Sequence, residues 1–334
     1  MNSFGRLFRL ALTGESHGPA IGALIDGSPA GLPLAPEDFA ADLARRRPGR
    51  SGATARVEAD RVQILSGVFA EHTTGAPLLL VFANEEADSD AYEAMKDTPR
   101  PGHADFAARA KFGGWNDYRG GGHFSGRVTV ALVAAGVVAK KILAPIEIHA
   151  EIVEIGGAAD YEPLLAEAIA AGDSLGGVVQ CVARGLPAGL GEPFFDAVES
   201  LIAHLALAIP AVKAIEFGDG FAAARVRGSQ YNDAIIDAAG RTATNHAGGV
   251  NGGLTNGAEL VFRVAVRPTA SIALPQQTVD LVTGRPRELR VAGRHDACIA
   301  LRLPVILEAA CAVVLADLML LEQRIPRVWG VTKH

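Results

Sequence analysis

Apolar residues recur at helical spacing in four stretches of the chain. Two of these stretches are amphipathic and follow Gly/Pro-rich turns, and two are longer and almost wholly apolar. An apolar stripe at this spacing predicts a helix packed against a core, whereas a helix that is apolar on every side is typical of the interior. The sequence therefore predicts amphipathic helices over residues 37–46 and 192–207, and buried helices over residues 128–143 and 303–320.

Short runs rich in β-branched residues lie between these helices. They predict strands over residues 61–66, 77–82, 178–183 and 259–266. Helices interleaved with strands indicate an α/β or α+β architecture in which the long apolar helices are buried against sheets. No Pro/Ser-rich linker divides the chain, so we expect a single domain spanning residues 1–334.

The two halves of the chain contain similar segments in the same order. GSPAGLP, beginning at Gly27, precedes the helix over 37–46, and GLPAGLG, beginning at Gly185, precedes the helix over 192–207. A Gly-containing segment with a histidine then precedes each apolar helix: GGGHFSGR in the first half and GRHDACIALR in the second. Internal duplication and chance similarity of turn-plus-helix units both remain open.

Composition narrows the class of protein. Hydrophobic residues make up 49% and charged residues 20% of the 334 residues, which excludes a mainly disordered chain. The net charge of −6 and the aromatic share of 6% argue against nucleic acid as a partner.

Three widely spaced cysteines without a CxxC pair favour a reducing compartment. The start lacks a signal peptide, and the most apolar later segment, residues 128–139, is too short to cross a membrane, so we expect a cytoplasmic protein.

Basic residues gather at one place in this acidic chain. Arg45, Arg46, Arg47 and Arg50 fall together at the end of a predicted helix. A solvated basic last turn is one interpretation. The other is a clamp for an anionic small molecule, because a guanidinium binds carboxylates and phosphates in a bidentate manner.

A short glycine-flanked motif near the start carries a serine and a histidine. Gly14, Ser16 and Gly18 fit the G-x-S-x-G pattern of a serine hydrolase. Only about a dozen residues precede the motif, too few for more than one strand, whereas a hydrolase serine follows several strands. The other interpretation is a plain turn in which the serine and the histidine satisfy backbone groups.

Further loops combine glycine with basic or acidic side chains. His103 lies two residues before Asp105, and residues 117–127 lead directly into an apolar helix, whose N-terminus could bind a phosphate. Residues 245–253, 267–271 and 293–296 complete the set. None has the ligand spacing of a zinc site or the dinucleotide fingerprint G-x-G-x-x-G after a strand.

Taken together and in this order, the motifs resemble the chorismate synthase family over nearly the whole chain. They are GRLFRLALTGESHG, RRRPG, ILSGVF, TTGAP, RPGHAD, DYRGGG, GLPAGLGEPFFD, EFGDGF, RGSQ, NHAGGVNGG and GRHD. The resemblance implies a homotetramer with a β-α-β sandwich fold and reduced FMN (FMNH2) as cofactor. It implies a carbon–oxygen lyase that removes phosphate from 5-enolpyruvylshikimate 3-phosphate by 1,4-anti elimination, with no net redox change.

The resemblance also implies roles for individual residues. His17 corresponds to the acid that protonates or polarises the departing phosphate, and His103 to the partner of the reduced flavin. Asp296 corresponds to an acid near flavin N5 that helps to take up the C6 proton. The implied substrate-binding residues are Ser16, Arg46, Arg100, Arg127 and Arg294. The implied flavin-binding residues are His123, Phe124, Ser125, Ala211, Gly252, Arg267, Pro268, Thr269, Ala270, Ser271 and Arg294.

The chain departs from the family pattern at several of these positions. Residues 123–129, HFSGRVT, stand where many members have RSSARET, and Arg267 stands where a lysine is usual. Pro210 replaces an asparagine, Ala270 a serine and Ala297 a proline, while Gly52 stands where some members carry a basic residue, with Arg50 close by.

Three other functions remain as alternatives: a related enzyme with an altered substrate, a serine hydrolase using Ser16, and a non-catalytic flavin- or anion-binding protein. For the source of electrons we expect an external flavin reductase, with NADPH acting only indirectly.

Overall fold

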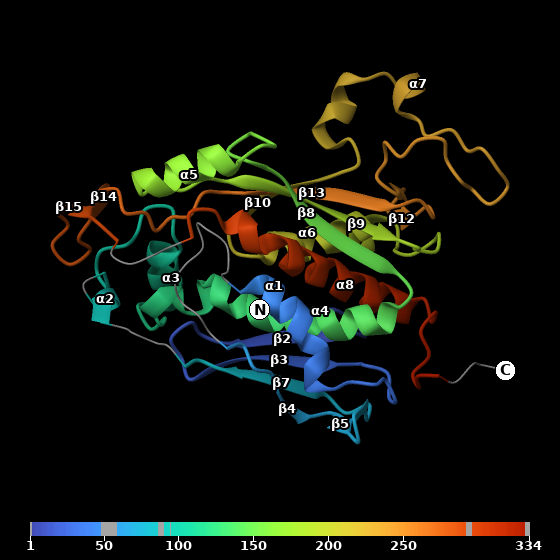
Figure 1. Cartoon of the computed structure of the whole chain (residues 1–334), viewed down its shortest axis with the longest axis horizontal. Coiled ribbons are helices and arrows are strands. Elements are labelled where there is room, and N and C mark those ends of the chain that lie inside the picture. Colours follow the sequence, from blue (N-terminus) through green and yellow to red (C-terminus); the bar gives the residue numbers. More distant parts are fainter. Residues whose placement is uncertain (1, 48–58, 86–89, 94, 292–295, 331–334) are drawn as a thin grey trace.

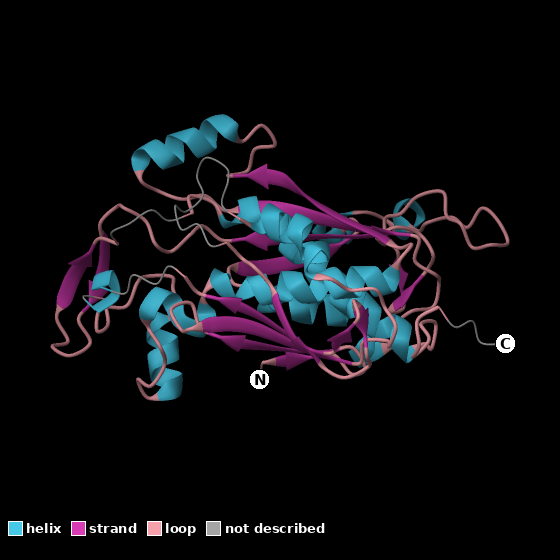
Figure 2. Cartoon of the chain, turned by 60° about the horizontal axis from the view of Figure 1, so that its bottom comes forward, coloured by secondary structure: helices cyan, strands magenta, loops and turns pink. Residues whose placement is uncertain are grey.

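The computed structural model describes residues 2–47, 59–85, 90–93, 95–291 and 296–330. Two antiparallel sheets lie on opposite sides of a layer of helices (Figures 1 and 2). The first sheet has the order β1-β2-β3-β7-β4, formed by β1 (Ser3–Phe4), β2 (Arg9–Gly14), β3 (Ala20–Asp26), β7 (Leu78–Ala83) and β4 (Gln63–Ser66). The second has the order β10-β13-β9-β8, formed by β10 (Val212–Phe217), β13 (Leu260–Val266), β9 (Gly177–Arg184) and β8 (Glu147–Ile155).

Four helices fill the space between the sheets: α1 (Ala40–Arg46), α4 (Thr129–Leu143), α6 (Val198–Ala208) and α8 (Leu303–Leu321). Helix α4 packs on the first sheet, α8 packs on the second, and the two helices pack against each other. This arrangement confirms the expected mixed architecture and β-α-β sandwich. The remaining helices are α2 (Asp90–Glu93), α3 (Asp105–Phe112), α5 (Glu162–Ala171) and α7 (Gly228–Tyr231).

Short elements connect this framework. Three two-stranded hairpins are formed by β5 (Val68–Phe69) with β6 (His72–Thr73), β11 (Val250–Asn251) with β12 (Leu254–Thr255), and β14 (Gln276–Val279) with β15 (Pro286–Leu289). The 3₁₀ helices are η1 (Pro36–Phe39), η2 (Arg119–Phe124), η3 (Gly126–Val128), η4 (Phe194–Asp196), η5 (Gly220–Arg225) and η6 (Ile299–Arg302).

The two halves of the chain have the same topology. In the first half the elements follow as β2, β3, α1, β4, β7 and α4, and in the second as β8, β9, α6, β10, β13 and α8. In each sheet the first strand pairs with the second, the second with the fourth, and the fourth with the third. Gly27 and Gly185 follow the second strand of each half with φ of 88° and 80°. This correspondence favours duplication over chance similarity.

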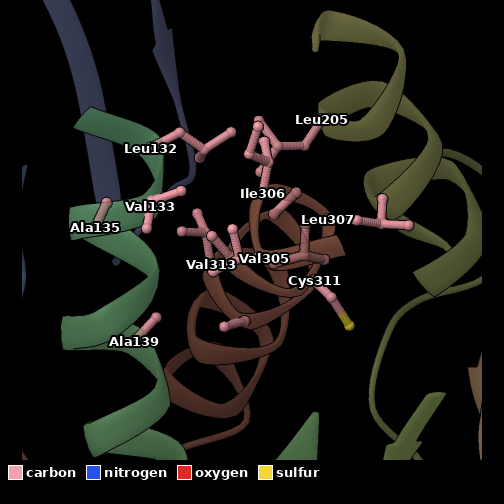
Figure 3. Close-up of a cluster of buried hydrophobic side chains, with 14 of the residues drawn as sticks. Leu132, Val133, Ala135, Ala139, Leu205, Val305, Ile306, Leu307, Cys311 and Val313 are labelled. Carbon is pink, nitrogen blue, oxygen red and sulfur yellow. The ribbon is translucent and has the colours of Figure 1, made fainter. Parts of the chain in front are cut away.

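Aliphatic side chains from α4, α6 and α8 meet in the interior (Figure 3). Leu132 and Val133 of α4 face Val305 and Ile306 of α8, and Leu205 of α6 packs beside them. Helix α8 is apolar on nearly every side and lies between its sheet and three helices, so almost all of its residues are buried. The core therefore connects both halves of the chain.

The predicted strands and the two long apolar helices are present, with ends shifted by one or two residues. The helix predicted over 37–46 is divided into η1 and α1, and of the helix predicted over 192–207 only the part from Val198 onward is α-helical, after the 3₁₀ helix η4. Two expectations were wrong. Two strands, β1 and β2, precede the Ser16–His17 loop, because the two-residue β1 pairs at the edge of the longer β2. The expectation that the apolar segments are too short to cross a membrane overlooked Ile299–Leu321, which is long and apolar enough to span one, although 83% of its most apolar window is buried in the molecule.

Candidate active site

The loop between β2 and β3 lies against the Gly-rich helix η2. Ser16 is buried, and its backbone N–H donates to the carbonyl oxygen of Gly122 at 3.0 Å. The hydroxyl of Ser125 donates to Oγ of Ser16 at 3.2 Å. Nδ1 of His123 lies 2.7 Å from the carbonyl oxygen of Gly14. These contacts bring residues 14–18 and 119–125, far apart in sequence, into one site.

The imidazole of His17 is enclosed by the same helix. A Cβ added to Gly120 would lie 2.4 Å from Cδ2 of His17, so a glycine at this position makes room for the ring. Tyr92 packs edge-on against the imidazole, with ring centroids 5.0 Å apart. Hydrogen bonds from Arg119 lower the pKa of the nearby Asp117 carboxyl, and the charge of His17 contributes to the same shift. His17 therefore lies close to a carboxylate.

His103 belongs to a network of charged side chains at the start of α3. Its Nδ1 lies 2.5 Å from Oδ1 of Asp105, and Arg100 donates to both carboxylate oxygens of Asp105 at 2.8 Å. Arg100 also donates to Oγ of Ser271 at 3.1 Å. Burial would raise the pKa of Asp105, but hydrogen bonds from Arg100 and His103 outweigh it and hold this pKa well below its usual range. Asp105 is thus a carboxylate that orients His103.

Two of the predicted substrate arginines share one buried carboxylate. Arg46 Nη2 donates to Oδ2 of Asp60 at 2.6 Å, and Arg127 Nη1 donates to Oδ1. Arg127 Nε also donates to Oδ1 of Asn84 at 3.0 Å. Arg46 and Arg127 are buried, an unusual position for two like charges. Such a pair is suited to bind an anion.

Asp296 lies at the start of the segment that leads into α8. Its Oδ1 accepts a hydrogen bond from Nη2 of Arg302 at 2.8 Å. Arg302 is close enough to Arg46 for its charge to lower the pKa of Arg46, after the larger effect of burial. Asp296 therefore lies at the edge of the arginine pair.

A groove of about 490 Å³ opens beside His103 and His123. Leu132, Leu205 and Ile209 provide apolar walls, and the predicted flavin residues Phe124, Ala211 and Arg267 lie on its lining. This volume and this mixture of apolar walls with few polar groups are typical of small-molecule sites.

Further observations on the 267–271 segment agree with a bound flavin phosphate or ring. Arg267 donates to the carbonyl oxygen of Pro268 at 2.8 Å, and burial lowers its pKa with no carboxylate of the described residues opposing that shift. Oγ1 of Thr269 is buried without a hydrogen-bond partner among the described residues. Ala270 and Pro268 lie beside Gly102 and Gly176, respectively. The residues present therefore fit FMN, with a cation, apolar walls and an unsatisfied hydroxyl.

Gly252 is not brought to this groove, and Ser125, Pro268, Thr269, Ala270 and Ser271 are not among the residues that line it. Gly252 lies in the β11–β12 hairpin, next to the start of β13, whereas Arg267 follows the end of β13. A strand of seven residues separates the two ends by roughly 20 Å, so Gly252 does not share the groove within one chain. Arg294 lies outside the described residues, as do Arg50 and Gly52.

Several residues of the site were missed from the sequence. Asp60, Asn84, Asp117 and Arg302 contact predicted site residues, but none of them was predicted to take part in the site. A signal was available for two of them, since Asp117 opens the DYRGGG segment and Arg302 ends the GRHDACIALR segment.

Comparison with known proteins agrees with this geometry. A model of the chorismate synthase family matches residues 8–320. A chorismate synthase from Chitinophaga pinensis is 60% identical over 330 residues, covering 98% of this chain and 99% of its own. One from Korarchaeum cryptofilum is 49% identical over 346 residues, covering 94% and 96%.

A solved crystal structure of a chorismate synthase superposes on 96% of this chain and 93% of its own, with a TM-score of 0.73 and 28% identity. These similarities reject the serine hydrolase interpretation of Ser16. The chain belongs to the chorismate synthase family, lyases that eliminate phosphate from 5-enolpyruvylshikimate 3-phosphate to form chorismate.

Proposed function

We propose that this chain eliminates phosphate at a site organised by η2, with reduced FMN held in the groove beside His103 and His123. The observation that carries this proposal is the run of three glycines in η2. Gly120 contacts the ring of His17, Gly121 lies beside the ring of His103, and Gly122 accepts the backbone hydrogen bond of Ser16. The glycines of η2 thus lie beside His17, the proposed acid, His103, the proposed partner of the flavin, and Ser16.

The flavin makes a difficult proton removal possible. The hydrogen at C6 of the substrate is too weakly acidic for an ordinary side-chain base, and a bound reduced FMN would supply transient electron density with no net redox change. Arg267, Thr269 and Ser271 would hold its polar groups, while Leu132 and Leu205 would contact its apolar ring system. The protein supplies orientation, charge and proton transfer.

The histidines, the arginines and Asp296 have different roles in the proposed reaction. His17, which lies beside the Asp117 carboxylate, gives a proton or a hydrogen bond to the departing phosphate. Arg46 and Arg127 neutralise the anionic substrate. His103, oriented through Asp105, lies beside the reduced flavin and stabilises it. Asp296, held by Arg302, takes up the C6 proton.

Flavin titration tests the cofactor site. We expect FMN to bind the wild-type protein, with quenching of flavin fluorescence, and we expect Arg267→Ala to weaken binding by at least about 10-fold, because a charge-assisted contact is worth about 1.5–3 kcal/mol. Arg285→Ala, which removes an arginine between β14 and β15, serves as the control and should bind like wild type. Equal affinity of Arg267→Ala and wild type would place the flavin elsewhere.

The whole chain is proposed to form one domain that works as a homotetramer in the cytoplasm. The continuous core supports one domain, and the buried free cysteines are typical of a reducing compartment. Ile235 and Ile236 are 72% and 57% exposed near α7, which extends away from the second sheet (Figure 1), so a partner subunit could cover them. Light scattering of the purified protein decides the subunit number.

The electrons are proposed to come from an external flavin reductase, with NADPH only as its indirect source. The sequence has no dinucleotide fingerprint to support direct NADPH binding. Rapid oxidation of NADPH by the purified protein with FMN and no added reductase would contradict this proposal.

A further inference from the structure

We infer that Asp60 is a positioning residue: its carboxylate aims the guanidinium groups of Arg46 and Arg127 at one oxyanion of the substrate and balances part of their charge. This inference rests on the proposed function only in taking Arg46 and Arg127 as substrate-binding residues. The geometry around Asp60 stands independently of that proposal.

Asp60 lies between Arg46 and Arg127. Its side chain is fully buried, and each carboxylate oxygen accepts from a different arginine, Oδ2 from Arg46 at 2.6 Å and Oδ1 from Arg127. The side chains of Arg46 and Arg127 are 5% and 6% exposed. A guanidinium is planar and rigid, so fixing one N–H also fixes the direction of the others.

Each arginine keeps an unused donor after binding Asp60. Nε of Arg46 and Nη2 of Arg127 are buried and have no hydrogen-bond partner among the residues that the structure describes. Buried donors without partners are uncommon in folded proteins, and each one calls for an explanation. An oxyanion of a bound ligand would satisfy both.

The backbone of Asp60 is consistent with a role beyond packing. Its φ of 48° lies in the left-handed region, which costs free energy for a residue with a side chain. Such conformations persist where the surroundings impose them, and they cluster at functional sites. Here the two arginines hold the carboxylate in place.

The charges around Asp60 determine how strongly the two arginines bind an anion. Arg46 and Arg127 carry two positive charges against one negative charge on Asp60, while Arg302 is paired with Asp296. The remaining positive charge attracts an anion, and the carboxylate competes with that anion for the same guanidinium groups. Asp60 therefore weakens ground-state binding while it fixes the direction of both arginines, a combination that favours turnover over tight binding.

The test compares turnover with the binding of inorganic phosphate in holoenzyme containing reduced FMN. In Asp60→Asn we expect kcat to fall by at least about 10-fold, because small errors in orientation are costly. We expect the Kd for inorganic phosphate to stay equal or become tighter, because a competing carboxylate is gone. Asp26→Asn removes a carboxylate from an exposed ion pair with Arg9 and should leave both values unchanged.

A merely structural role would give a different result, since disorder in the site weakens phosphate binding together with kcat. That parallel loss, or a kcat within twofold of wild type, would overturn the inference.

If Asp60→Asn does not fold, Asp60→Glu is the variant to measure. It keeps the charge but displaces the carboxylate, so kcat should fall while phosphate affinity stays close to wild type. Wild-type kcat in Asp60→Glu would equally overturn the inference. An inactive wild-type holoenzyme would instead count against the proposed function.

Discussion

Gly136 of α4 lies directly against Ala309 of α8, so that a Cβ on Gly136 would come within 2.3 Å of the Ala309 Cβ. The main helices of the two halves of the molecule therefore meet at a point where one of them has no side chain. This contact joins the two halves of the core, and the separation of the two sheets depends on it.

Gly136→Ala should destabilise the protein. Alanine is favoured over glycine in a helix by about 1 kcal/mol, but overpacking a close helix contact costs typically about 1–3 kcal/mol, and backbone atoms of α8 cannot move aside as a flexible side chain would. Urea unfolding measures the difference. Gly126→Ala is the control, because nothing lies within 4 Å of its added Cβ. Equal or greater stability of Gly136→Ala would show that α4 and α8 are farther apart.

The pattern of the sequence predicted the long helices better than the first strands. Helices α4 and α8 are apolar on all sides, which is a clear signal, and the repeated turns after Gly27 and Gly185 pointed to the duplication. Strand β3, AIGALID, carries alanine and glycine, which have little preference for strands. Strand β8, EIHAEIVEI, does alternate and could have been predicted.

Gly120→Ala should impair catalysis through His17. The added methyl group would overlap the imidazole, and we expect kcat to fall by at least about 10-fold, approaching the loss of about 10²-fold or more expected for His17→Ala. Gly284→Ala is a matched control, because it has a similar positive φ of 68° but open space around the added Cβ. It should lose some stability but retain activity. Full activity of Gly120→Ala would mean that His17 does not take part in the mechanism.

Asp105→Asn should lower turnover by at least about 10-fold, because the amide can no longer fix the proton on Nδ1 of His103 as the carboxylate does. Asp97→Asn is the control, since Asp97 also pairs with an arginine, Arg109 of α3, but at the surface of the molecule. Steady-state kinetics with reduced FMN would compare the two. Similar kcat values for both variants would mean that His103 does not depend on its carboxylate.

Stability should fall in acid partly through Glu308. Burial would raise the pKa of Glu308, but hydrogen bonds and charge from Arg45 and Lys140, with the N–H of Ala150, lower it below its ordinary value of 4.5. A lowered pKa in the folded protein means that the contribution of Glu308 is complete above that ordinary value and is lost as the pH falls through the folded value.

Glu308→Gln should therefore reduce the free energy of unfolding by about 1–3 kcal/mol at pH 7, because charged donors lose their partner. The difference from wild type should shrink as the pH falls below 4.5. Urea unfolding of both proteins at pH 7 and at a pH below 4.5 measures this difference, and Glu288→Gln, at an exposed position, is the control. A difference that grows in acid would contradict the assigned direction.

The candidate site was predictable only where the chain carries local motifs. Ser16, His17 and His103 stand in short glycine-rich segments, so their residue types and neighbours pointed to chemistry. Asp60 and Arg127 are 67 residues apart, and nothing in their local sequence links them. Contacts of this kind arise from the packing of the first sheet against α4, which only the folded structure reveals.

The most direct test of the account is an anaerobic reaction of the purified protein with chemically reduced FMN and 5-enolpyruvylshikimate 3-phosphate, in which chorismate and phosphate are both followed. We predict that the two products appear in equal amounts over many turnovers while the flavin ends reduced. Binding of FMN with no chorismate formed would contradict the account and would indicate that the HFSGRVT segment has redirected the site to another substrate.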